Sequence, residues 1–278
     1  MNALPDLVRA ADLIAARGSR LGRPLHILAE TTSTNDEAKR AARLGAPHGS
    51  TWVAESQTAG RGRQGRRWIS ARGESLLFSV LFRHSGPLAR MPLVSLAAGL
   101  AIAEAVERAS PTASVRVKWP NDVVIADAQG LQLAKIAGIL AETSTTGSSV
   151  DAIVVGVGIN VLTRCFPDEL AELATSVTLV ADRVPDRAEI LADALAGLDR
   201  DVPVVLAKGL GPLHDRLARK DALAGRLVRS DASYGIARGI DAEGRLVVER
   251  EGRREAWSSG EVHLVSSSPA ERREGGSL

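Results

Sequence analysis

The chain has 278 residues, a formal net charge of +2 and a hydrophobic content of 45%. This length suits one large domain or a large and a small one, and the near-balanced charge gives no general argument for a nucleic-acid-binding protein. With one cysteine, Cys165, the chain can form no internal disulfide and no cysteine-based zinc site. No apolar run is long enough for a signal peptide or a membrane span, so we expect a cytoplasmic protein without membrane contact.

The first part of the chain mixes helices and strands. Apolar residues at helical spacing predict a helix over 3–17, and capping residues at 33–36 predict a second helix that stops at Gly45. A buried, alanine- and leucine-rich helix is predicted over 88–108. Strands are predicted in chain order at 25–30, 51–55, 75–82, 115–118, 123–126, 133–141 and 151–158. This irregular order favours an α+β fold over a regular doubly wound sheet.

The second part of the chain, from residue 160, has helices followed by short strands. An irregular stretch at 160–178 holds a short helix at 167–173, and helices are predicted at 186–199 and 202–218. Short alternating segments then predict a small β-barrel with strands at 225–229, 233–241, 244–249, 253–258 and 261–265. We therefore divide the chain into an N-terminal helical segment (1–24), a large α+β domain (25–220), a small β-domain (221–266) and a disordered tail (267–278).

The segment from Gly60 to Trp68 is glycine-rich and carries four arginines with no acid. Arginine side chains bind carboxylate or phosphate with paired donors, and glycines let the backbone approach a ligand closely. The alternatives are a solvated basic loop and an RGG-like nucleic-acid segment. A dinucleotide fingerprint is rejected, because no helix follows and the span 80–90 has no acid.

Three further motifs place polar residues near strand ends. Lys118 to Asp122 contains a proline, so the chain turns there and presents polar side chains, although Asn121 and Asp122 also suit a plain turn. Lys135 interrupts an apolar strand and calls for an anionic partner, unless it extends to solvent from an edge strand. The glycines in the strand that ends at Asn160 indicate a close approach of a ligand or of another backbone.

Together these motifs resemble those of the biotin protein ligases. The resemblance covers about 25–265 and rests on motifs in the family's order, which stand here as Ser33-Thr34-Asn35, Gln57 with Gly60–Arg63, Lys118–Asp122, Lys135–Leu140 and Gly156–Asn160. It implies an α+β, mixed-sheet catalytic domain related to class II aminoacyl-tRNA synthetases, followed by a C-terminal SH3-like barrel. The segment Pro167–Leu170 with Ala174–Ser176 is similar to the family's loop on the adenylate side.

The resemblance also implies an activity. The protein would form biotinyl-5′-AMP from biotin and ATP, with Mg²⁺ accompanying the nucleotide, and transfer biotin to a lysine of a biotin carboxyl carrier protein. A lipoate-type ligase on the same fold is the alternative, but the polar residues around Ser33 and Gln57 favour a ureido ring. Residues 1–24 are too few for a helix-turn-helix domain, so we expect the monofunctional type, without specific DNA binding, as a monomer or weak homodimer.

Residue roles follow from the same resemblance. Arg63 and Lys135 would offset charge on the reacting oxygens, and Asp122 is a hypothesis for the base that takes the proton of the acceptor lysine. The motifs name no metal ligands. The loop 57–70 is expected to be mobile until biotin and ATP bind. Biotin would contact Ser33, Thr34, Asn35, Gln57, Gly60, Arg61, Gly62, Arg63 and Lys135, and ATP or the adenylate would contact Arg61, Arg63, Trp68, Lys118, Asn121, Lys135, Ile159 and Asn160.

Overall fold

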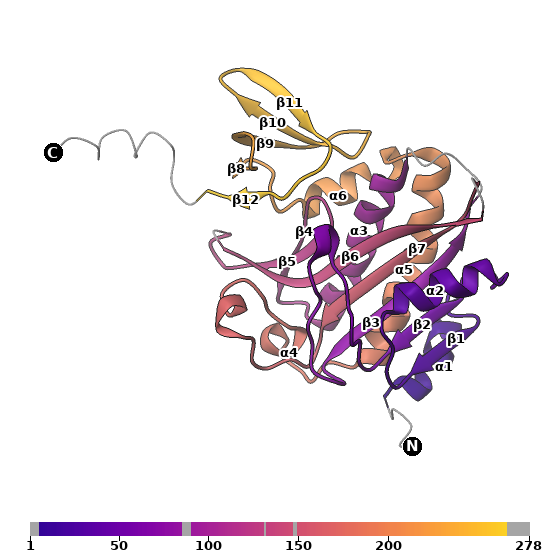
Figure 1. The fold of residues 1–278 in the computed structure, drawn as a ribbon. Helices are drawn as coiled ribbons and strands as arrows, with labels where there is room; N and C mark the ends of the chain where they lie inside the picture. The colour runs from indigo at the N-terminus through magenta and orange to yellow at the C-terminus, as the bar shows by residue number, and fades with distance from the viewer. Residues whose placement is uncertain (1–5, 85–89, 131, 147–148, 266–278) are drawn as a thin grey trace.

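The computed structural model describes residues 6–84, 90–130, 132–146 and 149–265. In these ranges a seven-stranded mixed sheet in the order β1-β2-β3-β7-β6-β5-β4 forms the centre of the molecule (Figure 1). Strands β1 and β2 are parallel and the other neighbours antiparallel, so the sheet is mixed, in agreement with the predicted α+β fold. The strands are β1 (Leu25–Leu28), β2 (Thr51–Ala54), β3 (Ser75–Arg83), β4 (Ser114–Lys118), β5 (Asp122–Ala126), β6 (Leu133–Thr146) and β7 (Ser149–Asn160).

The two faces of this sheet carry different side chains, because strand residues alternate in direction. Phe78 of β3 and Val155 of β7 enter the main apolar core. Their neighbours Ser79 and Gly156 both lie against Asn35 on the opposite face. The second face is therefore lined by small and polar residues at the centre of the sheet, which leaves room for a site there.

Helices cover both faces. The main core lies under α3 (Met91–Ala109) and α5 (Arg187–Lys208), with α1 (Ala10–Ala16) packed on α5 and α6 (His214–Lys220) on α3, whereas α2 (Thr34–Arg43) packs on the other face (Figure 1). Helix α3 is buried on most sides because it lies between sheet and α5. At Gly197 of α5 an added Cβ would be 2.9 Å from the Cβ of Ala101. No helix in the described ranges is long and apolar enough to cross a membrane.

Helix α2 begins and ends where the capping residues predict. Ser33 precedes it with an extended backbone (φ −161°), and Asp36 and Glu37 stand in its first turn, where acids suit the helix dipole. Gly45 follows its last turn with φ +87°, a left-handed conformation that glycine adopts without strain. As a result, the first turn of α2 sets Thr34 and Asn35 against the sheet.

The predicted break between helices at 186–199 and 202–218 is wrong. Helix α5 continues through Pro203, and a 3₁₀ turn (Gly211–Leu213) then leads into α6. Proline removes one backbone hydrogen bond from a helix. Here the turn around it is held by Asp201, which is 1% exposed and bonded to Arg200 at 2.7 Å and Arg216 at 2.8 Å.

The C-terminal part forms a second sheet, as predicted. Its order is β11-β10-β9-β8-β12, and all its pairs are antiparallel. The indole of Trp119 donates to the carbonyl of Gly244 at 2.9 Å and ties this sheet to the β4–β5 turn. The predicted tail at 267–278 and the start of the predicted helix at 3–17 lie outside the described residues. The strands are β8 (Leu227–Arg229), β9 (Tyr234–Ile240), β10 (Leu246–Arg250), β11 (Arg253–Trp257) and β12 (His263–Leu264).

Candidate active site

A cleft opens on the α2 face of the sheet, between the glycine-rich loop, the β4–β5 turn, strand β6 and the segment 260–262. Motifs that are distant in the sequence meet here because they sit at the ends and centre of adjacent strands. Most of the residues predicted for the site line this cleft, namely Ser33, Thr34, Asn35, Gln57, Arg61, Gly62, Arg63, Trp68, Lys118, Asn121, Asp122 and Lys135.

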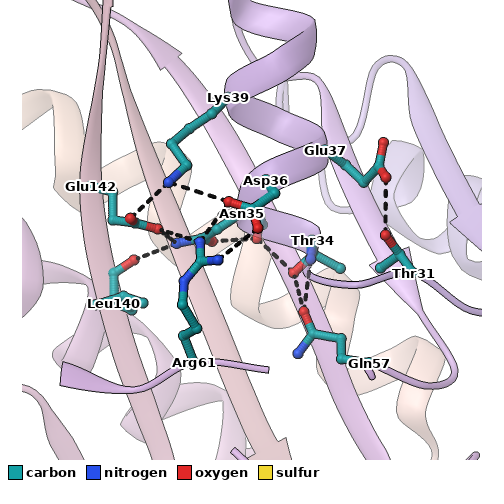
Figure 2. Close-up of polar contacts among 11 residues, drawn as sticks. Thr31, Thr34, Asn35, Asp36, Glu37, Lys39, Gln57, Arg61, Leu140 and Glu142 are labelled. Atoms are coloured by element: carbon teal, nitrogen blue, oxygen red, sulfur yellow. Dashed lines mark hydrogen bonds and ion pairs between the residues drawn. The ribbon is translucent and has the colours of Figure 1, made fainter. Parts of the chain in front are cut away.

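One end of the cleft is a polar pocket at the start of α2. The carbonyl oxygen of Gln57 accepts from the backbone nitrogen of Thr34 at 2.7 Å and from its hydroxyl at 3.1 Å (Figure 2). Since that oxygen takes both bonds, the NH₂ group of Gln57 is available as a donor at the cleft. Ser79 contacts the hydroxyl of Thr34 at 2.7 Å and the amide oxygen of Asn35 at 2.6 Å. The pocket thus offers fixed donors and acceptors to a small polar ring.

A cluster of charges closes the side of this pocket. The guanidinium of Arg61 makes two bonds of 2.6 Å to Asp36, and Lys39 lies 2.8 Å from Glu142 (Figure 2). The hydrogen bond from Arg61 is the main cause that holds the pKa of Asp36 below its ordinary value, and the same bond raises the pKa of Arg61. The cluster attaches the glycine-rich loop to α2.

The glycine-rich loop is a compact hairpin. Gln64 and Gly65 have consecutive positive φ angles of 56° and 74°, which is typical of a type I′ turn, and the Gly62 nitrogen donates to the Arg66 carbonyl at 2.7 Å. Arg66 is also ion-paired with Glu261 of the C-terminal segment. The loop is therefore held by polar contacts, and its mobility without ligand stays a prediction.

Trp68 lies flat against the central strands. Gly138 and Gly158 are paired across β6 and β7, and a Cβ at Gly158 would be 2.7 Å from the indole ring. The indole nitrogen is buried without a hydrogen-bond partner among the described residues, and the amine of Lys135 is 5.8 Å from the ring centre. Glycine at both positions is what lets the indole form the floor of the cleft.

Cations and one acid gather at the other end of the cleft. Lys135 is paired with Asp122 at 2.7 Å, so the lysine has the anionic partner that its apolar strand called for. Burial lowers the pKa of Lys118, although nearby Asp122 works against this, and burial also lowers the pKa of Arg63. Arg63 donates to the side chain of Asn121 at 3.1 Å. Lys118, Lys135 and Arg63 around Asp122 form a site suited to phosphate or carboxylate.

Three predicted residues do not line the cleft. Ile159 is fully buried and belongs to the core on the opposite face, so only its backbone is left to contact a ligand. Asn160 donates to the carbonyl of Thr175 at 3.0 Å and fixes the segment after β7. Gly60 is buried at the start of the loop, where an added Cβ would be 2.8 Å from the carbonyl oxygen of Trp68 and 3.1 Å from the side-chain nitrogen of Gln57.

Two parts of the site were not predicted from the sequence. Glu142, two residues after Leu140, contacts Asn35 and Lys39 from β6, and its only signal in the sequence was a lone acid directly after the predicted strand 133–141. The segment 260–262 reaches the cleft from the C-terminal sheet. No local pattern could reveal it, because its position depends on how the two sheets pack.

Known proteins share this architecture. The chain matches the biotin/lipoate A/B protein ligase family over residues 28–160 and the biotin protein ligase C-terminal domain over residues 226–265. A biotin–[acetyl-CoA-carboxylase] ligase from Mycobacterium tuberculosis is 36% identical over 253 residues, which are 87% of this chain and 90% of the relative. The bifunctional ligase/repressor BirA of Salmonella typhimurium is 35% identical over 79% of this chain and 68% of its own length. The structure of the biotin protein ligase from Aquifex aeolicus in complex with biotin and ATP has a TM-score of 0.73 and 29% identity, covering 87% of this chain and 99% of that one.

Proposed function

The chain belongs to the biotin protein ligases, and on that basis we propose that it activates biotin with ATP to biotinyl-5′-AMP and transfers the biotin to a lysine of a biotin carboxyl carrier protein. The observation that carries this proposal is the cleft itself. Its polar pocket lies at one end, its cations at the other, and the indole of Trp68 forms the floor near those cations. A ligand with a polar ring at one end and a carboxylate joined to an adenylate at the other fits this order of polar pocket, cations and indole along the cleft.

The polar pocket is where we place the head group of biotin. Gln57 offers its NH₂ group there, and Thr34 and Asn35 are held in position by bonds to neighbouring side chains. A bare acyl chain would leave the NH₂ group of Gln57 without a partner, and a buried unpaired group costs about 1–3 kcal/mol. The pocket therefore favours biotin over lipoate or octanoate.

Adenylate formation joins two anions. The carboxylate oxygen of biotin attacks the α-phosphorus of ATP, a new C–O–P linkage forms and pyrophosphate leaves. Lys135, Arg63 and Lys118 would stabilise the charge that grows on the phosphoryl oxygens, and the floor formed by Trp68 would hold adenine. Mg²⁺ accompanies the triphosphate, and we assign it no ligands.

The transfer step needs a base, for which we propose Asp122. Its carboxylate is paired with Lys135 at 2.7 Å. When the adenylate's phosphoryl oxygens take the amine of Lys135, the carboxylate becomes available to accept the proton of the acceptor lysine. The lysine then attacks the mixed anhydride, an amide bond forms and AMP leaves. Lys135 thus takes part in both steps, and Asp122 acts in the second.

Several broader features belong to this proposal. The five C-terminal strands would form the family's SH3-like barrel, the catalytic domain would share its descent with class II aminoacyl-tRNA synthetases, and the domains would divide at 24, 220 and 266. We further propose a cytoplasmic enzyme, as a monomer or weak homodimer, without sequence-specific DNA binding. A gel shift that survives competitor DNA at physiological salt would contradict the last point.

Calorimetric titration tests the proposed function. Biotin should bind to the free protein, and the heat and apparent affinity should change when ATP and Mg²⁺ are added, because the adenylate forms and stays in the cleft. Lipoate and octanoate serve as controls. Binding of lipoate as tight as that of biotin would favour a lipoate-type ligase instead.

A further inference from the structure

The amide group of Asn35 has both of its hydrogens bonded to the protein. Its nitrogen donates to the carboxylate of Glu142 at 2.6 Å and to the carbonyl of Leu140 at 3.2 Å (Figure 2). Burial opposes the ionisation of Glu142, but hydrogen bonds from Lys39 and Asn35 hold its pKa below the ordinary value. An ionised carboxylate and a backbone carbonyl can only accept. The NH₂ group of Asn35 is therefore fixed toward β6 and away from the head-group pocket.

The amide oxygen of Asn35 faces the opposite way. It accepts from the hydroxyl of Ser79 at 2.6 Å. Gly156 lies next to it, so close that a Cβ there would be 2.1 Å from this oxygen. Both Asn35 and Gly156 line the cleft. A carbonyl oxygen has two lone pairs, and Ser79 takes one of them, so one acceptor position remains at the cleft wall beside the glycine.

We propose that Glu142 is a positioning residue for substrate recognition: by fixing the amide of Asn35, it presents to the head-group pocket an acceptor that takes an N–H of the ureido ring. This rests on the proposed function. Glu142 acts through Asn35 and is itself held from behind by Lys39 at 2.8 Å. A ligand that brings an acceptor to this point is rejected, because two acceptors would face each other without a hydrogen.

Exchanging the hydrogen-bond donor and acceptor between Asn35 and Glu142 tests the positioning role of Glu142. Asn35→Asp keeps an oxygen at the pocket but sets a carboxylate against Glu142, and calorimetry should show the Kd for biotin rising by about 30-fold or more. In Asn35→Asp/Glu142→Gln the new amide donates to the new carboxylate, while the carbonyl of Leu140 still faces an oxygen, so the Kd should fall at least about 5-fold below that of Asn35→Asp. A double variant that binds biotin no better than Asn35→Asp overturns the proposal.

A matched control separates this from a general change of charge. Glu37 lies on α2, as Asn35 does, but its carboxylate contacts Thr31 and Arg40 and not Asn35. Asn35→Asp/Glu37→Gln has the same net charge as the rescued variant and should bind biotin as weakly as Asn35→Asp alone. Equal rescue by both partners would mean that only the charge matters, which overturns a positioning role. Thermal unfolding of each variant without ligand shows that it is folded.

Ligand discrimination provides the second readout. In each of two cyclic carbamate analogues of biotin, one ureido N–H is replaced by oxygen. The unaltered protein should bind one of them at least about 10-fold more weakly than the other, and Asn35→Leu should remove this preference. Equal binding of both analogues by a protein that binds biotin overturns the inference and leaves the proposed function standing, whereas failure of the unaltered protein to bind biotin contradicts the proposed function.

Discussion

Gly156 lies on the cleft side of β7, and Gly156→Ala should abolish most biotin binding without touching a charged residue. The new Cβ would lie 2.1 Å from the amide oxygen of Asn35, where ordinary contact begins at 3.4 Å. Asn35 therefore has to move, and its bonds to Ser79 and Glu142 are lost. The lost bonds and the overpacking lower the stability of the fold, and the displaced Asn35 no longer presents its oxygen to biotin, which should weaken biotin binding by about 2–4 kcal/mol. This corresponds to roughly 30- to 700-fold in Kd.

Calorimetry with biotin and thermal unfolding without ligand measure the two effects of this substitution separately. Gly99→Ala is the matched control, because a Cβ at that position of α3 meets only ordinary contacts, the nearest 3.4 Å away on Val117. It should leave biotin binding unchanged and stabilise the fold by about 0.5–1 kcal/mol, since glycine is costly inside a helix. A folded Gly156→Ala protein that binds biotin within about 3-fold of the original would refute the proposed geometry of the head-group pocket.

Three other perturbations address the cations and the loop. Lys135→Ala should slow single-turnover adenylate formation by about 100-fold or more while changing the Kd for biotin less than about 5-fold, because its charge acts mainly on the developing phosphoryl charge; an unchanged rate would contradict its role. Limited trypsin digestion should cut between Arg61 and Arg67 faster as salt is raised, since the pairs of Arg61 with Asp36 and Arg66 with Glu261 are partly exposed. Biotin with ATP should protect the same bonds, and cleavage that neither salt nor ligand affects would rule out a loop held by ion pairs and closed by ligand. Lys118→Met should slow pyrophosphate exchange yet raise Tm at pH 7 by about 2–4 °C. Burial lowers the pKa of Lys118 in the folded state. The cost of keeping this lysine charged is therefore fully present below the folded pKa and fades as pH rises toward the pKa of free lysine, about 10.4. The gain in Tm should shrink over the same pH range, and a gain that does not vary with pH would point to packing instead.

Local sequence patterns predicted most of the helices and strands correctly, because the spacing of apolar residues and the effect of capping residues both operate over a few residues. Helix α2 begins after Ser33 and ends before Gly45 for that reason. The break expected near residue 200 failed because the sequence shows Pro203 but not the buried contacts of Asp201 with two arginines, one of them 15 residues away. A network of this kind overrides a local preference and is visible only in the folded chain.

The site shows the same limit. The motifs indicated which residues carry charge or hydrogen-bonding groups, and most of them do line one cleft. The motifs could not indicate on which face of the sheet each strand residue lies. Ile159 was therefore predicted as a ligand contact together with Asn160, although its side chain faces the core. Glu142 was missed because its importance comes from lying opposite Asn35 across two elements. Positioning residues are set by packing, whereas the groups that bind ligand leave local patterns.

Pyrophosphate–ATP exchange tests the central claim most directly. With radiolabelled pyrophosphate, ATP, Mg²⁺ and biotin, label should enter ATP, because adenylate formation is reversible while the intermediate stays in the cleft. Omitting biotin, or replacing it with lipoate or octanoate, should reduce exchange to background. Exchange that proceeds without biotin, or equally well with lipoate, would contradict the assignment of this cleft to biotin activation.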